Sequence, residues 1–383
     1  ELAWQATQLI VTDLRGTSEI VPLKPDQKDY YSYPEVTAPS IPKWRAAGAK
    51  ALMTGFVQTR SDGRLTIGCY VYDLKTGREL ARKGFVVGAG DWRRGAHKCS
   101  GVIYQALTGA PGMFDTKVAY VAETGLVSNV VRRIAVMDSD GFNHDYATKG
   151  DTMVLSPRLS PGAQTIAFVG FTGGNPSVRL LDIASGQVRS LVPGDPLSFA
   201  PRFSPDGRHI AFTMMQGGNA DIYLADSAGG AAVRLTSSPG IDTAPSFSPD
   251  GTKIIFESDR SGSQQLYVMA ADGTGQRRVS FGNGAYAAPA WSPDGERIAF
   301  TGRTGGGRRI GVMRADGSEE RVLTAGPRDD SATWSASSRE LLFERTDAAE
   351  RPALLRITLD GGEPRAFTIP QPGSDPDWSG VLE

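Results

Sequence analysis

The chain has 383 residues with 41 basic and 42 acidic side chains, so its formal net charge is -1. A protein that binds nucleic acid through the phosphates usually carries a basic excess, so this balance argues against nucleic acid as the main partner. Hydrophobic residues make up 40% of the chain, which is enough for a core, but no apolar run approaches the roughly 20 residues that a membrane-spanning helix needs.

Residues 1–112 show no internal repeat, and their patterns predict a mixed α/β domain. Apolar residues follow helical spacing from Ala3 to Leu14, and Gly16 is a typical helix end. Three strands are predicted between short turn sequences, over residues 50–57, 65–72 and 79–87. Such strands would form an antiparallel meander.

A second helix is predicted over residues 94–107, because Gly109 and Pro111 would end it there. A helix that opens the chain and packs on a sheet also suggests that a strand precedes Glu1. The repeated sequence that follows places a domain boundary near Gly112, so residues 113–383 are expected to form a second domain.

The second domain repeats one sequence pattern every 43 or 44 residues. An aromatic residue or Leu precedes Ser-Pro-Asp-Gly or a variant of it, and a strand ending in Ile-Ala-Phe or a similar triplet follows. In such a turn proline fixes φ, aspartate bonds locally and glycine takes the left-handed conformation. The copies are anchored on Leu159, Phe203, Phe247, Trp291, Trp334 and Trp378.

Each repeat is long enough for four short strands, which is the size of one β-propeller blade. Residues 118–120 and 134–138 look like the opening strands of a unit that lacks its aromatic strand, while residues 376–379 supply an aromatic strand with nothing after it. We therefore predict an all-β six-bladed β-propeller, closed by pairing of the C-terminal strand near Trp378 with the first blade near Tyr120. An open β-solenoid is the alternative.

Sequence signatures of catalysis are absent. No Gly-x-Ser-x-Gly elbow, His-Glu-x-x-His, phosphate loop or Cys-x-x-Cys occurs. The three histidines His97, His144 and His209 are expected to be structural or exposed. Cys69 and Cys99 are expected to be buried thiols, and a disulfide between them stays open as an alternative. The protein is predicted to have no enzymatic activity and to need no cofactor.

The loops that lead into the aromatic strands would ring one mouth of the central channel. Among them Phe199 and Tyr286 are predicted to be apolar anchors of the kind enriched at interfaces, and the loop residues Leu197 and Ser198 belong to the same predicted surface. Four carboxylates would make the mouth acidic, namely Asp242, Asp329, Asp330 and Asp375. Two alternatives are a calcium ion held by these groups and a hydrolase whose acidic active site uses Asp242 with Asp330.

Both parts of the chain resemble the TolB family of the Tol-Pal cell-envelope system. The resemblance rests on five segments: Trp44-Arg-Ala-Ala-Gly48, Leu52-Met-Thr-Gly-Phe-Val57, Ala96-His97, Ala106-Leu-Thr-Gly109 and Lys117-Val-Ala-Tyr-Val121. The blade motifs are moderately specific, and the order of an α/β domain followed by a six-unit propeller is far more specific.

The resemblance implies a periplasmic binding protein that supports outer-membrane integrity and cell division. Members of the family bind the lipoprotein Pal at the propeller mouth, which adds Leu155 and Thr243 to the predicted site by position. They bind TolA through a flexible N-terminal segment, so a chain without that segment is expected to bind TolA weakly or not at all. Toxins of the colicin class exploit the Pal site, and the protein is expected to be a monomer.

Overall fold

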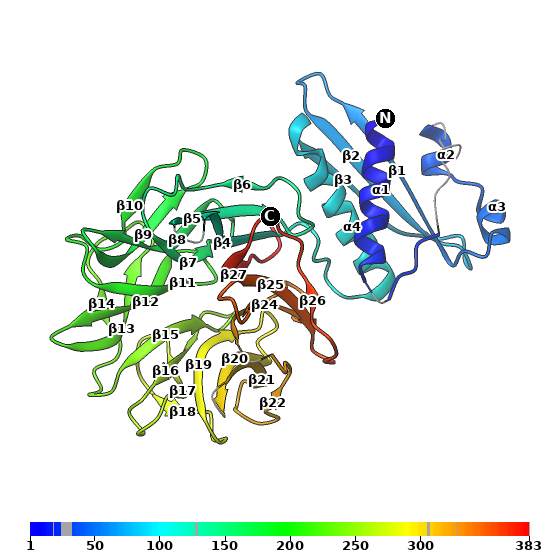
Figure 1. The fold of residues 1–383 in the computed structure, drawn as a ribbon. Helices are drawn as coiled ribbons and strands as arrows, with labels where there is room; N and C mark the ends of the chain where they lie inside the picture. Colours follow the sequence, from blue (N-terminus) through cyan, green and yellow to red (C-terminus); the bar gives the residue numbers. More distant parts are fainter. Residues whose placement is uncertain (18, 24–32, 127–128, 305–306, 327, 383) are drawn as a thin grey trace. The chain divides into compact units, whose positions relative to one another are not determined.

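The computed structural model describes the chain except for residues 18, 24–32, 127–128, 305–306, 327 and 383 (Figure 1). The chain divides into two compact units, Glu1–Asp115 and Thr116–Glu383. The division lies three residues beyond the boundary expected from the sequence.

The first unit is a three-stranded antiparallel sheet with the strand order β1-β2-β3, and the long helix α4 packs on β2 and β3 while α1 packs on α4. Figure 1 shows the two long helices side by side over the sheet. The elements are α1 (Leu2–Arg15), α2 (Tyr33–Thr37), α3 (Ile41–Ala46), β1 (Ala51–Thr59), β2 (Leu65–Asp73), β3 (Glu79–Val87), a 3-10 turn (Ala89–Asp91) and α4 (Trp92–Thr108).

The predicted meander and both long helices are confirmed. Helix α4 buries Ala96, Cys99 and Ile103, which are spaced to lie on one face, and it ends at Gly109 with a left-handed φ of 77°. The helices α2 and α3 have five and six residues, which is too short for an apolar period, and the sequence patterns do not predict them. Within the described residues, no helix is long and apolar enough to cross a bilayer.

The second unit contains six four-stranded antiparallel sheets, which we call sheets I to VI. Sheet I is β27 (Gly373–Trp378), β4 (Lys117–Leu126), β5 (Asn129–Asp138) and β6 (Asp145–Tyr146). Sheet II is β7 (Val154–Leu159), β8 (Thr165–Thr172), β9 (Asn175–Asp182) and β10 (Val188–Ser190). Sheet III is β11 (Ser198–Phe203), β12 (His209–Gln216), β13 (Asn219–Asp226) and β14 (Val233–Arg234).

Sheets IV to VI repeat the same order of strands. Sheet IV is β15 (Asp242–Phe247), β16 (Lys253–Ser258), β17 (Gln265–Ala270) and β18 (Arg277–Arg278). Sheet V is β19 (Ala285–Trp291), β20 (Arg297–Thr304), β21 (Gly307–Arg314) and β22 (Arg321–Val322). Sheet VI is β23 (Asp329–Trp334), β24 (Glu340–Thr346), β25 (Pro352–Thr358) and β26 (Arg365–Ala366).

The two ends of the second unit meet in sheet I. Strand β27 pairs with β4, so that Trp378 lies opposite Val118 and Gly373 opposite Ala122, as the sequence predicts (Figure 1). The first strands of the six sheets also contact one another in cyclic order, from β7 through β11, β15, β19 and β23 to β27 and back to β7.

An aromatic side chain fills the centre of each sheet. These residues occupy the third position of the Ile-Ala-Phe triplet or its variant, and all are at most 3% exposed: Tyr120, Phe168, Phe212, Phe256, Phe300 and Phe343. The Ser-Pro-Asp-Gly turns precede these strands, and in each the serine hydroxyl donates to the aspartate, as from Ser204 to Asp206 at 2.5 Å. The weaker copies place Ala163 and Ser338 in the left-handed conformation that glycine takes elsewhere.

Candidate functional site

In sheets II to VI the first strand runs from a loop at one edge of its sheet to a turn of the Ser-Pro-Asp-Gly type at the opposite edge, and β27 of sheet I starts from a loop in the same way. The loops and strand starts therefore gather at one edge of the unit, as expected. We call this edge the mouth, and it consists of residues 153–156, 197–200, 241–244, 285–288, 328–331 and 372–375.

A β-bulge interrupts each first strand at the mouth. The register shifts around one non-glycine residue whose φ lies between 47° and 55°, and these six residues are Ser156, Ala200, Ala244, Ala288, Ser331 and Asp375. A left-handed conformation costs an L-residue roughly 1–2 kcal/mol, so its recurrence in all six sheets indicates that the bulge is a required feature of the mouth.

Three of the six bulge amides bind a side chain from the second strand of the preceding sheet. The donor and acceptor pairs are Ala244 N with Thr213 Oγ1 at 3.2 Å, Ala288 N with Glu257 Oε2 at 3.3 Å and Asp375 N with Glu344 Oε2 at 3.2 Å. Sheet I has the apolar Val121 at the acceptor position, and Ser156 N donates to Asp375 Oδ2 at 3.1 Å instead. These bonds link sheet III to IV, IV to V, VI to I and I to II at the mouth.

Asp242 and Asp329 are not the exposed acidic residues that the sequence analysis expected. They are the first residues of β15 and β23, and both are fully buried beside an arginine. Arg345 donates to Asp329 through Nε at 2.6 Å and through Nη2 at 2.9 Å. Arg260 donates to Asp242 at 2.6 Å. The strand register turns both carboxylates inward, where an arginine neutralises each of them.

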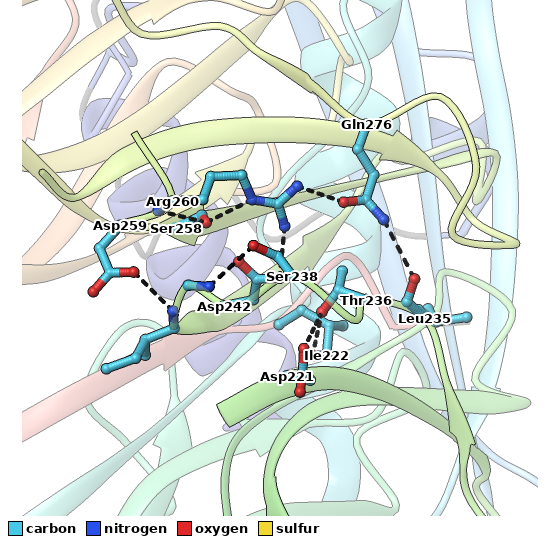
Figure 2. Close-up of polar contacts among 12 residues, drawn as sticks. Asp221, Ile222, Leu235, Thr236, Ser238, Asp242, Ser258, Asp259, Arg260 and Gln276 are labelled. Carbon is cyan, nitrogen blue, oxygen red and sulfur yellow. Dashed lines mark hydrogen bonds and ion pairs between the residues drawn. The ribbon is translucent and has the colours of Figure 1, made fainter. Parts of the chain in front are cut away.

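Figure 2 shows Arg260 reaching between Asp242 and Gln276 from the loop after β16. Its guanidinium also donates to Ser258 Oγ at 2.9 Å and lies over the Tyr267 ring at 4.9 Å from the centroid. Burial raises the pKa of Asp242 above its ordinary value, although Arg260 opposes the shift. Through these contacts Arg260 links the start of β15 to the end of β16 and to Gln276, which stabilises this part of the mouth.

Tyr286 is also not the exposed anchor that was expected. Its side chain is 2% exposed, packs against Phe300 and donates its hydroxyl to Glu320 at 2.8 Å. Ser198 and Thr243 are buried as well: Ser198 Oγ accepts the Val178 amide and the Thr243 hydroxyl donates to Glu257. These three residues support the mouth rather than present a surface to a partner.

Asp330 and Asp375 are half-buried at the mouth, so part of each side chain is accessible to a partner. Asp330 accepts from Arg308 at 2.8 Å and from Thr301 at 2.8 Å. Glu344, which the sequence analysis did not single out, lies close to both carboxylates. Burial and the charge of Asp375 raise the pKa of Glu344 to about 7.

Exposed apolar side chains occupy the mouth of sheets II to IV. We call Met153, Leu197, Met215 and Ile241 the apolar arc, and they are 43%, 37%, 42% and 50% exposed. Met215 N donates to the Leu197 carbonyl, so the β12–β13 loop lies beside the mouth. Leu155 and Phe199 are half-buried and lie two residues after Met153 and Leu197. Met153 and Ile241 share one position of the repeat with Leu197, in loops that the sequence places at the mouth, but they were not among the predicted contact residues. Met215 was not predicted.

Charged side chains occupy the part of the mouth formed by sheets V and VI. Arg308 binds Asp330, and Arg328 in the loop before β23 binds Glu350. We call these four residues the charged arc. The mouth therefore has an apolar part and a charged part, which differs from the uniformly acidic rim expected from the sequence.

Two arginines meet one carboxylate further along the first strands. Asp377 lies 3.4 Å from Arg202 and 3.9 Å from Arg158, and it accepts the Leu159 amide at 2.8 Å. Burial raises the pKa of Asp377 to about 6, against the opposing charge of Arg158. No sequence signal pointed to this cluster, because its members come from three different sheets.

The arrangement needed for the alternative hydrolase is not seen in the contacts of the described residues. Asp242 binds Arg260 and Asp330 binds Arg308, and no hydrogen bond between the two carboxyl groups occurs among those contacts. An acid–base pair needs both groups within reach of one reacting atom. The mouth is instead built from separately neutralised carboxylates and a patch of apolar side chains.

Comparison with known proteins gives the family. The TolB amino-terminal domain matches residues 1–80, and the TolB beta propeller domain matches residues 104–382. The crystal structure of TolB from Acinetobacter baumannii is similar with a TM-score of 0.78 and 27% sequence identity, covering 99% of this chain and 94% of that chain.

Two curated relatives carry the name Tol-Pal system protein TolB. The one from Zymomonas mobilis is 48% identical over 191 residues, which is 50% of this chain and 42% of the relative. The one from Rhizorhabdus wittichii is 48% identical over 171 residues, which is 45% of this chain and 39% of the relative. The matched part thus spans about two fifths of the length of these relatives. Since the propeller domain match alone covers residues 104–382, the chain belongs to the TolB family.

Proposed function

We propose that the protein is a non-catalytic periplasmic scaffold of the Tol-Pal system that binds the lipoprotein Pal at the mouth. The observation that carries this proposal is the exposed apolar arc at the mouth, in a chain of the TolB family. The relatives named as Tol-Pal system proteins support the assignment to that system. The predicted six-bladed ring, closed through β27, belongs to the same proposal, and the cyclic contacts of the first strands support it.

The apolar arc and the charged arc would contribute differently to binding: the first to affinity, the second to orientation and association rate. Burying Leu197 and Ile241 under a partner would remove apolar surface from water, which is the main source of affinity in protein association. The ion pairs of the charged arc lie at the rim, where charges set orientation and association rate more than affinity. Phe199, Leu155 and Asp375 are half-buried in first strands at the mouth and complete the proposed site.

The remaining TolB-like properties are part of the proposal. TolA would bind through the N-terminal region, independently of the mouth. Colicin-class toxins would compete with Pal for the mouth, and the protein would act as a monomer in maintaining the outer membrane during division. The two domains proposed for these roles are residues 1–112 and 113–383.

A calorimetric titration with the purified periplasmic domain of Pal tests the proposal. We expect saturable binding that weakens by about 30-fold for Leu197→Asp and for Ile241→Asp, because a buried charge at an interface anchor costs on the order of 2 kcal/mol. Phe199→Ala is expected to weaken binding similarly. The matched control is Val188→Asp, which changes a 45% exposed valine in the outermost strand β10 and should leave affinity unchanged.

Circular dichroism of each variant would establish that the fold is retained. Absence of any heat or complex at tens of micromolar Pal would contradict the proposed function. Equal losses in the arc variants and in Val188→Asp would remove the apolar arc from the site while leaving Pal binding in place.

A further inference from the structure

We propose that Cys69 and Cys99 form a disulfide bond that fastens helix α4 to strand β2 when the chain folds in an oxidising compartment. This proposal rests on the proposed function in one respect only, namely that the periplasm is the oxidising compartment. The bond itself can be tested on the purified chain without Pal, TolA or any other partner.

The two thiols come from different elements but share one core. Cys69 lies in the middle of β2, opposite Gly55 of β1 and Lys83 of β3, and Cys99 lies on the face of α4 that packs on the sheet. Cys69 is 1% exposed and Cys99 is 0% exposed. Both are free thiols in the structure, and each is the main influence on the other's pKa, which places the two side chains next to one another.

A short separation between helix and strand is what a disulfide requires, since its two Cα atoms usually lie 4.4–6.8 Å apart. One helical turn before Cys99, Gly95 faces Ile67, which lies two residues before Cys69 on the same face of β2. A Cβ atom built on Gly95 would be 2.8 Å from Ile67 Cδ1. The glycine therefore lets α4 approach β2 closely at the place where the cysteines meet.

Other uses of the pair fit the surroundings less well. A structural zinc site takes four ligands, whereas these are the two cysteines of the whole chain. The nearby His97 bonds through Nδ1 to Asp13 at 2.8 Å, on the side of α1. A reactive thiol needs solvent access, which neither cysteine has in the folded unit.

The bond would form by thiol–disulfide exchange with a protein or small-molecule disulfide as the oxidant. The thiolate of one cysteine attacks the oxidant, releases its first thiolate and forms a mixed disulfide. The second cysteine thiolate then attacks that protein sulfur, which closes the Cys69–Cys99 bond and releases the second thiolate of the oxidant. The protein loses two protons and two electrons, and the oxidant disulfide is reduced to two thiols.

Exchange is expected before α4 completes its packing on the sheet. In the folded unit both thiols are buried, so an oxidant does not reach them. Their interaction raises the pKa of the Cys99 thiol and lowers that of the Cys69 thiol, so burial rather than thiolate fraction limits the exchange. The finished bond would then be shielded from reductants by the same burial.

Mass spectrometry of the chain refolded in a glutathione redox buffer tests the proposal. We expect a mass about 2 Da below that of the reduced chain, no alkylation in denaturant without reductant, and a Cys69–Cys99 linked peptide. Quantitative alkylation of both cysteines after refolding in that buffer would overturn the proposal.

Thermal unfolding provides the second readout. Reduction with dithiothreitol in the presence of mild denaturant should lower the Tm of the first unit by more than about 5 °C, because the bond closes a loop of roughly 30 residues in the unfolded chain. The Cys69→Ala/Cys99→Ala variant is the matched control, and its Tm should not respond to the reductant. An equal response of both proteins would also contradict the proposal.

Discussion

Asp242 and Asp329 occupy the same position in sheets IV and VI, and in both sheets the carboxylate is buried with an arginine that follows it in the chain. Sequence patterns could place these residues at the start of a first strand. They could not show that the strand register turns the carboxylates inward, because the arginines lie 18 and 16 residues further on, just after the second strand in sheet IV and near its end in sheet VI. The burial of Tyr286 was missed in the same way, because its partner Glu320 lies 34 residues further along the chain.

Removing the arginine from such a pair should be costly. We expect Arg345→Met to lower the free energy of unfolding by about 3–5 kcal/mol, because it leaves the carboxylate of Asp329 buried without its partner. The double variant Asp329→Asn/Arg345→Met should recover much of this loss. Arg351→Met changes an exposed pair with Asp347 and should cost at most about 1 kcal/mol. Urea unfolding checks all three, and equal effects of Arg345→Met and Arg351→Met would contradict the argument.

The raised pKa of Glu344 makes the stability of the protein decrease as the pH rises. Its pKa is raised from 4.5 to about 7, so its contribution to stability is present below pH 4.5 and is lost as the pH rises through 7. Glu344→Gln cannot ionise, and we expect its stability relative to the parent to increase by up to about 3 kcal/mol between pH 5 and pH 8. Denaturant unfolding at both pH values measures this change. The control Glu319→Gln, at a 70% exposed side chain, should show no such trend, and a flat difference for Glu344→Gln would refute the assignment.

The turns between the third and fourth strands differ in whether they pack on the neighbouring sheet. Gly317 follows β21 and Gly361 follows β25 at the same distance, and their φ values are 92° and 83°. A Cβ atom on Gly317 would lie 1.9 Å from the Val279 carbonyl oxygen of sheet IV, whereas a Cβ atom on Gly361 meets nothing within 4 Å. Both turns end in Asp-Gly, so the sequence predicted the turns but not which of them touches a neighbour.

This difference predicts the result of a matched pair of substitutions. Gly361→Ala should cost about 1 kcal/mol through backbone strain alone. Gly317→Ala should cost at least about 2 kcal/mol more, because the Val279 carbonyl must also move. Thermal unfolding of the two variants would show whether the turn of sheet V is anchored to sheet IV, and equal costs would mean that it is not.

Elements with a strong sequence period were predicted well. The repeat predicted where the strands of sheets I to VI lie, because serine, proline, aspartate and glycine each meet a local requirement of the turn that separates two strands. The helices α2 and α3 have no such period and were missed. The sequence placed Met153 and Ile241 in the loops at the starts of the first strands, but exposure there depends on packing between sheets. Their exposure, and the presence of Met215 beside them, were therefore found only in the structure.

At the scale of the whole molecule, the ends of the second unit are joined by β27, and the first strands contact one another in a cycle. The two edges of the six sheets, the mouth and the edge opposite to it, differ in their side chains. The mouth has bulged strands, the apolar arc and the charged arc. The opposite edge consists of tight, polar turns such as the one at Asp250, whose hydrogen bonds to Ser248 and Thr252 lower its pKa to about 2. This difference is why we assign docking to the mouth.

Hydrogen exchange of the protein with and without the periplasmic domain of Pal tests that assignment most directly. We predict slower exchange on Pal binding in residues 151–156, 195–200, 215–219 and 239–244, which contain the apolar arc and its flanks. The turns at 204–208, 248–252 and 292–296 should be unaffected. Protection of those turns with no change at the mouth would contradict the account.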